Sequence, residues 1–228
     1  MKQLTRKAAA NSNDVLTLAG FYEFKGIRDS KRLPAQWAQF ASAYAAMNYD
    51  LGVLVPATSR KLHNTPLASW PVVEAEPVFT TQTVRSKTIG FMFVPKPAGE
   101  QARQTLERDI QNQAANIRPT VDLLIGISPW GKSREQAFLE NNPGLFDLLL
   151  GSGPGGAVNH TYIGDNQTLW IRPYTKGKVV NTVFFPDWRN LDLTSGRLPR
   201  HRISIEAIAL DERYPPDAAI KTIFEQNP

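Results

Sequence analysis

The sequence has 228 residues, of which 42% are hydrophobic and 21% charged, ordinary values for a globular protein that forms one large domain. It contains no cysteine, which excludes disulfides, thiolate metal sites and cysteine nucleophiles. The net charge of +5 is scattered along the chain, and no apolar stretch approaches the ~20 residues that cross a bilayer, so we expect neither nucleic-acid binding nor a membrane span.

Apolar runs in the first half of the chain predict strands that alternate with helices. We expect strands at 14–20, 51–55, 71–73 and 87–94, and helices at 34–50 and 100–118. The spacing of Trp37, Phe40, Tyr44 and Met47 is that of one apolar helix face.

The second half of the chain is richer in strands. We expect strands at 121–127, 145–150, 169–172, 178–185 and 201–210, and helices at 133–141 and 216–224. The strands at 169–172 and 178–185 are expected to pair through a turn at Gly177. This order predicts an α/β protein with mixed β-sheets.

A glycine-rich stretch, GSGPGG at 151–156, follows the apolar run that ends at Leu150. A phosphate-binding loop of the Walker type needs a lysine directly after its glycines. Here the first lysine after the glycine-rich stretch is Lys176. A dinucleotide fingerprint needs a helix directly after the glycines, whereas 159–165 predicts a loop and a strand. The stretch therefore fits neither kind of phosphate site.

Candidates for a metal or hydrolytic centre are few. The three histidines, His63, His160 and His201, lie far apart in the sequence, which favours separate surface roles. Ser152 lies in GSG, short of the GxSxG pattern of a serine nucleophile, and a proline directly follows Ser128.

Four carboxylates could form a catalytic pair. These are Asp50, Asp122, Glu135 and Asp147. Each of the three aspartates stands just before a predicted buried strand, which favours a structural role in the turn that leads into the strand, or a helix cap.

Segments in the same order along the chain carry a family resemblance. VLTLAGFYEFKG resembles LLLDAGDxFxG, and YAAMNYDLGVLVPATSRKL resembles MNxxGYDxxxxGNHEFDxG. Further on, VDLLIGISPWGKSREQAFLENNPGLFDLLLGSGPG resembles DxxIxLSHxGxxxDxxLAxxxPGIDxIIxGHSH. ASWPVVEAEPVF, KTIGFMFV, TLWIRPYTKGKVVNTVFF and HRISIEAIALDERYPPDAAIKTIFEQ match further pieces between and after these. Together they resemble the metallophosphoesterase domain of the periplasmic 5′-nucleotidase and UDP-sugar hydrolase family.

This resemblance implies an αββα sandwich of two mixed β-sheets flanked by helices, as a single domain over residues 1–228. The family's first strand has no counterpart before residue 14, and its C-terminal nucleotide-binding domain is absent from the sequence. Because members of the family are mostly exported, the resemblance implies a periplasmic or extracytoplasmic location, although MKQLTRKAAANSNDVL lacks the apolar core of a signal peptide.

The sequence departs from the family at its metal ligands. The resemblance places the aspartate of the GD pair at Phe21 and the Asn-His-Glu of GNHE at 56–58, where Pro56, Ala57 and Thr58 stand. The histidine of LSHxG falls at Pro129, and the histidines of GHSH fall at Ser152 and Pro154. A two-metal site needs several oxygen and nitrogen ligands, so we expect no metal and no cofactor.

The resemblance instead predicts a vacated cleft that could contact a ligand. Its expected lining residues are Phe21, Pro56, Thr58, Ser128, Trp130, Ser152, Gly153, His160 and Arg172. The first hypothesis is an inactive relative that binds an unidentified protein or small ligand. Two alternatives stay open: an enzyme with a relocated site at His160, Arg172 and nearby carboxylates, or a subunit completed by a strand from another chain.

Overall fold

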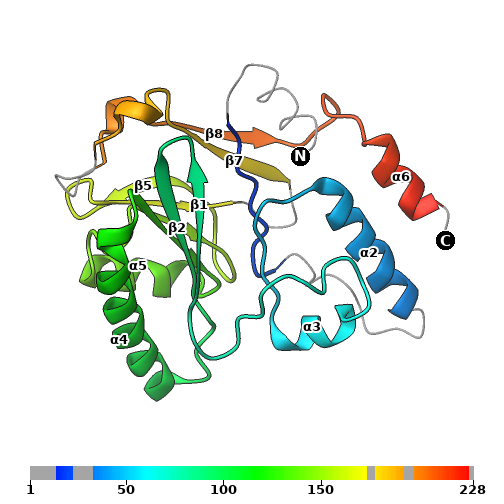
Figure 1. Cartoon of the computed structure of the whole chain (residues 1–228), viewed down its shortest axis with the longest axis horizontal. Helices are drawn as coiled ribbons and strands as arrows, with labels where there is room; N and C mark the ends of the chain where they lie inside the picture. Colours follow the sequence, from blue (N-terminus) through cyan, green and yellow to red (C-terminus); the bar gives the residue numbers. More distant parts are fainter. Residues whose placement is uncertain (1–13, 23–32, 174–177, 193–197, 226–228) are drawn as a thin grey trace. The chain divides into compact units, whose positions relative to one another are not determined.

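The computed structural model describes residues 14–22, 33–173, 178–192 and 198–225. The chain divides into two compact units (Figure 1). Unit 1 comprises Met1–Val73 and Asp211–Pro228, and unit 2 comprises Glu74–Leu210.

Unit 2 contains a six-stranded sheet in the order β1-β2-β3-β4-β6-β5. Its strands are β1 (Val78–Val84), β2 (Lys87–Phe93), β3 (Leu123–Ser128), β4 (Leu148–Gly151), β5 (Val158–Ile163) and β6 (Thr168–Arg172). The four inner strands β2, β3, β4 and β6 are parallel, and β1 and β5 pair antiparallel at the two edges. The sheet is therefore mixed, as the sequence predicts.

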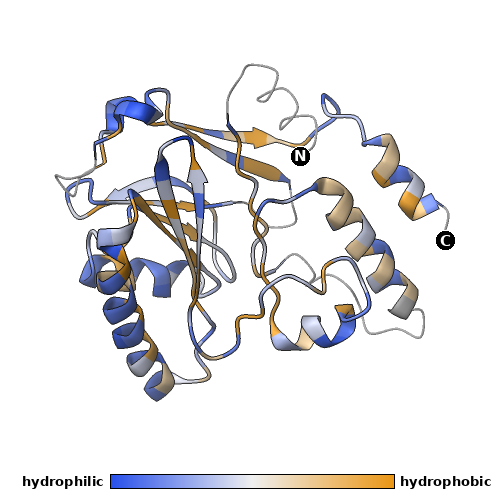
Figure 2. Ribbon diagram, in the orientation of Figure 1, coloured by the Kyte–Doolittle hydropathy of each residue, from blue (hydrophilic) through white to orange (hydrophobic). Residues whose placement is uncertain are grey.

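Two helices make the crossovers between the parallel strands. α4 (Glu100–Ile117) joins β2 to β3, and α5 (Lys132–Asn141) joins β3 to β4. α4 buries Leu106, Ile110 and Ala114, which recur every four residues on one face, and Figure 2 shows the rest of this helix as largely hydrophilic.

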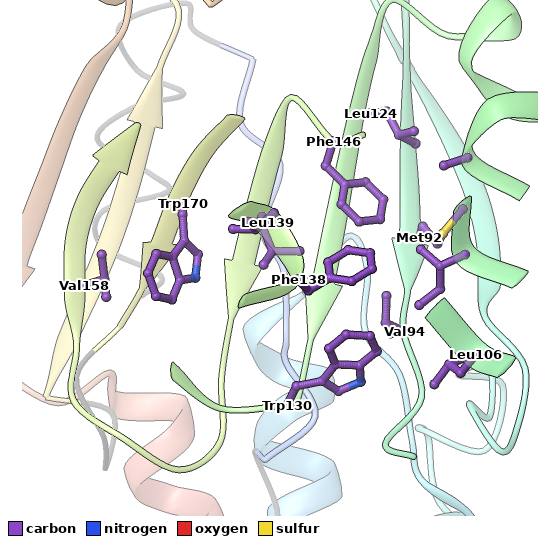
Figure 3. Packing of buried hydrophobic residues seen from close by; sticks show 13 residues of the cluster. Met92, Val94, Leu106, Leu124, Trp130, Phe138, Leu139, Phe146, Val158 and Trp170 are labelled. Atoms are coloured by element: carbon purple, nitrogen blue, oxygen red, sulfur yellow. The ribbon is translucent and has the colours of Figure 1, made fainter. Parts of the chain in front are cut away.

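The core of unit 2 lies between these helices and the sheet. Figure 3 shows Phe138 and Leu139 of α5 among Phe146, Trp170 and Met92 from the region of the strands. β3 is buried at every position, as expected for a parallel strand in the middle of a covered sheet. This core sets the positions at which the parallel strands end.

A second, antiparallel pair of strands belongs to unit 2. β7 (Val179–Phe184) pairs with β8 (Ser204–Ala209). The predicted pairing of 169–172 with 178–185 is wrong, because β6 pairs with β4 and β5 in the large sheet. The predicted turn at Gly177 lies outside the described residues.

Unit 1 contains three helices among its described residues. These are α2 (Leu33–Met47), α3 (Pro56–Leu62) and α6 (Ala218–Glu225). Trp37, Ala41 and Leu62 form its core with Leu54 and Leu67. The Phe40 ring of α2 meets the Phe224 ring of α6 edge to face at 5.3 Å, so α6 packs on α2.

The apolar runs near the start of unit 1 form bridges in place of full strands. Leu18 pairs with Leu51, and Leu54 pairs with Val72, each as an isolated parallel bridge. No predicted element corresponds to the helix α3, which begins at Pro56. Proline suits the first turn of a helix, so the same residue that ends an extended run can start a helix.

The predicted α/β class, with a mixed sheet flanked by helices, is confirmed. The predicted helices at 34–50, 100–118, 133–141 and 216–224 correspond to α2, α4, α5 and α6.

Candidate functional site

The loops that follow the parallel strands meet at the carboxyl edge of the sheet in unit 2. The Ser152 N–H and hydroxyl both donate to the Ser128 carbonyl, at 2.8 Å each. The Gly131 N–H donates to the Ser152 carbonyl at 3.0 Å, and the Trp130 indole donates to the Pro95 carbonyl at 2.7 Å. The ends of β2, β3 and β4 are therefore joined by short hydrogen bonds.

A buried carboxylate, Glu135, lies in the first turn of α5 behind these loops. Its side chain is 0% exposed. One carboxylate oxygen accepts from the backbone N–H groups of Gly131 and Ser152, both at 3.2 Å. The other accepts from the Trp170 indole at 3.1 Å and forms an ion pair with Arg172. Both oxygens are thus engaged within the protein.

Arg172, the last residue of β6, is the cation of this ion pair and is 3% exposed. Its guanidinium donates to the carbonyls of Ser152, Gly153 and Pro154 at 3.0–3.2 Å, and its Nε donates to the Gly156 carbonyl at 3.3 Å. We call Glu135 and Arg172 the central ion pair. It ties α5 and β6 to the whole glycine-rich loop 152–156.

Gly151, the last residue of β4, leaves space for the side chains of the central ion pair. A Cβ atom at this position would lie 2.0 Å from Oε2 of Glu135 and 2.7 Å from Cγ of Arg172. Only glycine leaves room for both side chains to approach the end of β4. The glycine-rich stretch therefore accommodates protein side chains, and its amides and carbonyls bond to them.

The structure brings together five of the predicted cleft residues. Ser128, Trp130, Ser152, Gly153 and Arg172 all lie at the carboxyl edge of the sheet. Trp130 is buried and packs edge to face on Phe138 at 5.2 Å, so its ring belongs to the core of unit 2.

The other predicted cleft residues belong to unit 1 or to the strand β5. Phe21, Pro56 and Thr58 belong to unit 1, and Pro56 and Thr58 form the first turn of α3. His160 is exposed on β5 and lines a surface hollow of about 600 Å³.

This hollow runs between α5 and the edge strand β5, and we call it the α5–β5 groove. Its helix side is lined by Lys132, Gln136 and Glu140, and its other side by residues 157–163. Tyr162 lies under the Arg200 guanidinium, 4.3 Å from the ring centroid, and burial raises the pKa of its hydroxyl. Apart from His160, no sequence pattern indicates this groove.

The three aspartates before strands are confirmed as structural. Asp50 accepts from the N–H and hydroxyl of Thr17 at 2.6 and 2.7 Å, and Asp122 accepts from the Thr88 N–H at 2.7 Å. Asp147 accepts from the Leu124 N–H at 2.7 Å and pairs with Arg118. Each carboxylate satisfies a backbone donor at the start of a neighbouring extended segment.

The carboxyl edge of unit 2 does not fit a two-metal centre. A proline, a tryptophan and a serine occupy the loops after β3 and β4, and the nearby carboxylate, Glu135, already accepts from four donors. The guanidinium of Arg172 adds a positive charge that opposes cation binding there. Within the described part of the chain, no cluster of three or more histidine, aspartate or glutamate side chains could hold a metal ion.

No family model and no curated protein matches the sequence. The fold, however, is similar to that of solved nucleotidases, and it is a metallophosphoesterase-like fold. One similar structure is a 5′-nucleotidase from Candida albicans, with a TM-score of 0.58 and 12% identity over 97% of this chain and 49% of that one. Another is the NAD nucleotidase of Haemophilus influenzae, with a TM-score of 0.58 and 11% identity over 99% of this chain and 48% of that one.

A hypothetical protein from Thermus thermophilus is also similar, with a TM-score of 0.48 and 14% identity over 72% of this chain and 78% of that one. The chain spans about half the length of each of the two nucleotidases. In the described ranges, no helix has the length and apolar character that crossing a membrane requires.

Proposed function

We propose that this chain is a binding protein built on a metallophosphoesterase-like fold, without the two-metal hydrolysis of phosphate esters. The observation that carries the proposal is the central ion pair, Glu135 and Arg172. It occupies the carboxyl edge of the parallel strands, where the resemblance places metal-binding histidines in the loops after β3 and β4.

The chemistry of the ion pair supports this proposal. A buried carboxylate that accepts from a guanidinium, an indole and two amides has no lone pair directed to a metal ion. Releasing it would leave Arg172 buried without its counter-charge, which costs several kcal/mol. A cation would therefore have to displace an arrangement that is already satisfied.

The relocated enzyme is the weaker candidate for a similar reason. It would use Arg172 to hold a substrate, yet five hydrogen bonds from this guanidinium already go to Glu135 and to four loop carbonyls. Of the two residues that this alternative names, only His160 then remains to contact a substrate. We also propose an extracytoplasmic location, on the family resemblance, and fractionation of the source cells would test it.

The first test is an assay of phosphate-ester hydrolysis. The purified chain is incubated with p-nitrophenyl phosphate, AMP and NAD in the presence of Mn²⁺, and its bound metal is measured by elemental analysis. We expect background turnover and no stoichiometric metal.

The control is a mock preparation from cells that lack the chain, purified and assayed in parallel. Turnover that is equal in both preparations comes from a contaminating enzyme. Chelator-sensitive turnover that is present only with the purified chain, together with stoichiometric bound metal, would show a working metal site and overturn the proposal.

A further inference from the structure

The carboxylate of Glu135 lies in a closed pocket whose hydrogen-bond donors come from three separate parts of unit 2. One carboxylate oxygen accepts from the backbone N–H groups of Gly131, directly before α5, and Ser152, directly after β4, both at 3.2 Å. The other accepts from the Trp170 indole at 3.1 Å and from the Arg172 guanidinium, both on β6. We call these four donor groups the donor pocket.

The four donors are held in place by contacts that do not involve the carboxylate. The Gly131 N–H also donates to the Ser152 carbonyl at 3.0 Å, and the Ser152 N–H donates to the Ser128 carbonyl at 2.8 Å. The Arg172 guanidinium donates to three loop carbonyls at 3.0–3.2 Å. Trp170 is buried in the core of unit 2 (Figure 3). The donor pocket should therefore keep its shape without the glutamate side chain.

The donor pocket is complementary to an anion. All four of its groups donate hydrogen bonds, and Arg172 adds a positive charge that is 3% exposed. Among the described residues, Glu135 is the carboxylate that pairs with this guanidinium and the acceptor that the Trp170 indole reaches. Loss of the carboxylate leaves both groups buried without a partner, which is costly for each. A cation or a neutral donor would not relieve this cost.

The size of the pocket restricts the anion to a small carboxylate. Exchange of Glu135 for alanine removes one methylene group and the carboxylate, which together have the heavy atoms of an acetate ion. The side chain is 0% exposed, and a Cβ on Gly151 would lie 2.0 Å from Oε2, so the chain encloses the site closely. Formate fits best, because it lacks the methyl group that would press on the remaining Cβ. Propionate is too large.

We propose that the donor pocket is a binding site for a small carboxylate and that the chain fills it with its own Glu135. This inference rests on the proposed function, in which the carboxyl edge binds no metal, and assigns that edge the opposite kind of ligand. Because Glu135 is part of the chain, its effective concentration at the site exceeds that of a free carboxylate. The wild type is therefore closed to external anions.

The proposal also gives the glycine-rich stretch 151–156 an anionic partner. The sequence of this stretch fits neither kind of phosphate site, yet its Ser152 N–H donates to an oxyanion. That oxyanion comes from α5 of the same chain, and Gly151 leaves the space that it needs. The loop and the helix are thus held together as a protein and its ligand would be.

The test is rescue of the variant Glu135→Ala by free carboxylates. Its thermal unfolding is followed in sodium formate, acetate, propionate and chloride at equal ionic strength and neutral pH. We expect formate, at ten times its Kd, to raise the Tm of the variant by about 3–6 °C relative to chloride. Acetate should act more weakly and propionate like chloride. The wild type should respond equally to all four salts.

Two matched variants make the rescue specific to the donor pocket. Glu135→Gln fills the pocket with a neutral side chain of the same size, so formate should give it no more stability than chloride does. Glu135→Ala combined with Arg172→Met removes the positive charge and should also lose the response to formate. A formate response in either control that equals the response of Glu135→Ala would place the bound formate elsewhere and overturn the inference.

The charge requirement is tested with acetamide, a neutral molecule with the shape of acetate. Rescue by acetamide as large as that by acetate would mean that any small molecule fills the space, and would overturn the inference. Equal Tm values of Glu135→Ala in formate and chloride would do the same. If this variant is unfolded in chloride, formate must restore its near-ultraviolet circular dichroism, and a chain that stays unfolded in molar formate contradicts the proposal.

Failure of this inference is distinguishable from failure of the proposed function. The rescue is measured as a change in Tm, in solutions that contain neither a divalent metal nor a phosphate ester. The proposed function is measured as chelator-sensitive hydrolysis by the wild type. Formate can thus fail to stabilise Glu135→Ala while the wild type still shows no hydrolysis, and the reverse can also be observed.

Discussion

At the scale of single residues, the central ion pair puts two opposite charges in the interior of unit 2. Burial of each charge is costly, and the cost is offset only because Glu135 and Arg172 satisfy each other and the loop amides and carbonyls around them. Removal of one partner leaves the other as an uncompensated buried charge. Removal of both takes away the two buried charges and leaves only neutral loop amides and carbonyls without their partners.

We therefore expect Arg172→Met to lower the free energy of unfolding by about 3–5 kcal/mol. The double variant Glu135→Met with Arg172→Met should lose less than Arg172→Met alone. Urea denaturation of the wild type, both single variants and the double variant measures the coupling between the two residues. If the two single losses simply add in the double variant, the two charges do not depend on each other.

Asp147 is a second buried charge with a different consequence. Burial raises the pKa of its carboxyl above the ordinary 3.8, because the loss of hydration outweighs the hydrogen bonds from Arg118 and the Leu124 N–H. Between 3.8 and the higher native pKa, the native state holds more protons than the unfolded chain. The free energy of unfolding that Asp147 contributes must then fall as the pH rises through this window.

We expect the stability of the wild type relative to Asp147→Asn to fall as the pH rises above 3.8 and to level off above the native pKa. Arg118→Gln should make the fall larger, because it removes the interaction that opposes the shift. Urea denaturation at a series of pH values measures both. A relative stability of the wild type that increases with pH would mean that Arg118, and not burial, controls the ionisation.

At the scale of elements, the end of β4 and the start of α5 are packed too closely for any side chain at Gly151. We expect Gly151→Ala to lower the free energy of unfolding by about 1–3 kcal/mol, the usual cost of an overpacked interior. Gly156→Ala is the matched control from the same loop, since a Cβ there meets nothing within 4 Å. Thermal unfolding of both variants compares them, and equal losses would mean that the loop, and not the close approach, sets the stability.

The helices and strands also show how much of the fold can be predicted from the sequence. Helices such as α2 and α4 follow from their apolar spacing, and the strands β2, β3 and β6 follow from apolar runs, because burial of one face is a local property of the pattern. No predicted strand corresponds to β1, because VFTTQTV is a half-exposed edge strand with few apolar residues. The pairing of β6 depends on which strands lie beside it in space, and adjacency in sequence does not reveal this.

The candidate site is predictable in part for the same reason. The family resemblance groups Ser128, Ser152 and Arg172 in one predicted cleft, and these three lie together at the carboxyl edge of the sheet. The sequence offers Glu135 only as one of four candidate carboxylates, because nothing in KSREQAFLEN marks its fourth residue as buried. Its partner lies 37 residues away, and only the crossover from β3 to β4 brings the two charges together.

At the scale of the whole molecule, unit 2 is one continuous stretch of chain with its own core. Its sheet, both crossover helices and the central ion pair all lie within Glu74–Leu210. We expect the fragment 74–210 to fold by itself, with cooperative thermal unfolding and the near-ultraviolet circular dichroism of a packed Trp130 and Trp170. A fragment that unfolds without cooperativity would show that unit 2 depends on residues of unit 1.

Unit 1 is formed by two separate stretches of the chain, so its two parts are synthesised at different times. α6 belongs to unit 1 and packs on α2, but every residue of unit 2 leaves the ribosome before α6 does. The face of α2 that carries Phe40 stays without its Phe224 neighbour while the 183 residues between them are translated, roughly 10–40 s at elongation rates of about 5–20 residues per second. A nascent chain that ends at Leu210 and is tethered to the ribosome through a linker long enough to clear the exit tunnel should thus bind chaperones through α2 while unit 2 already resists protease.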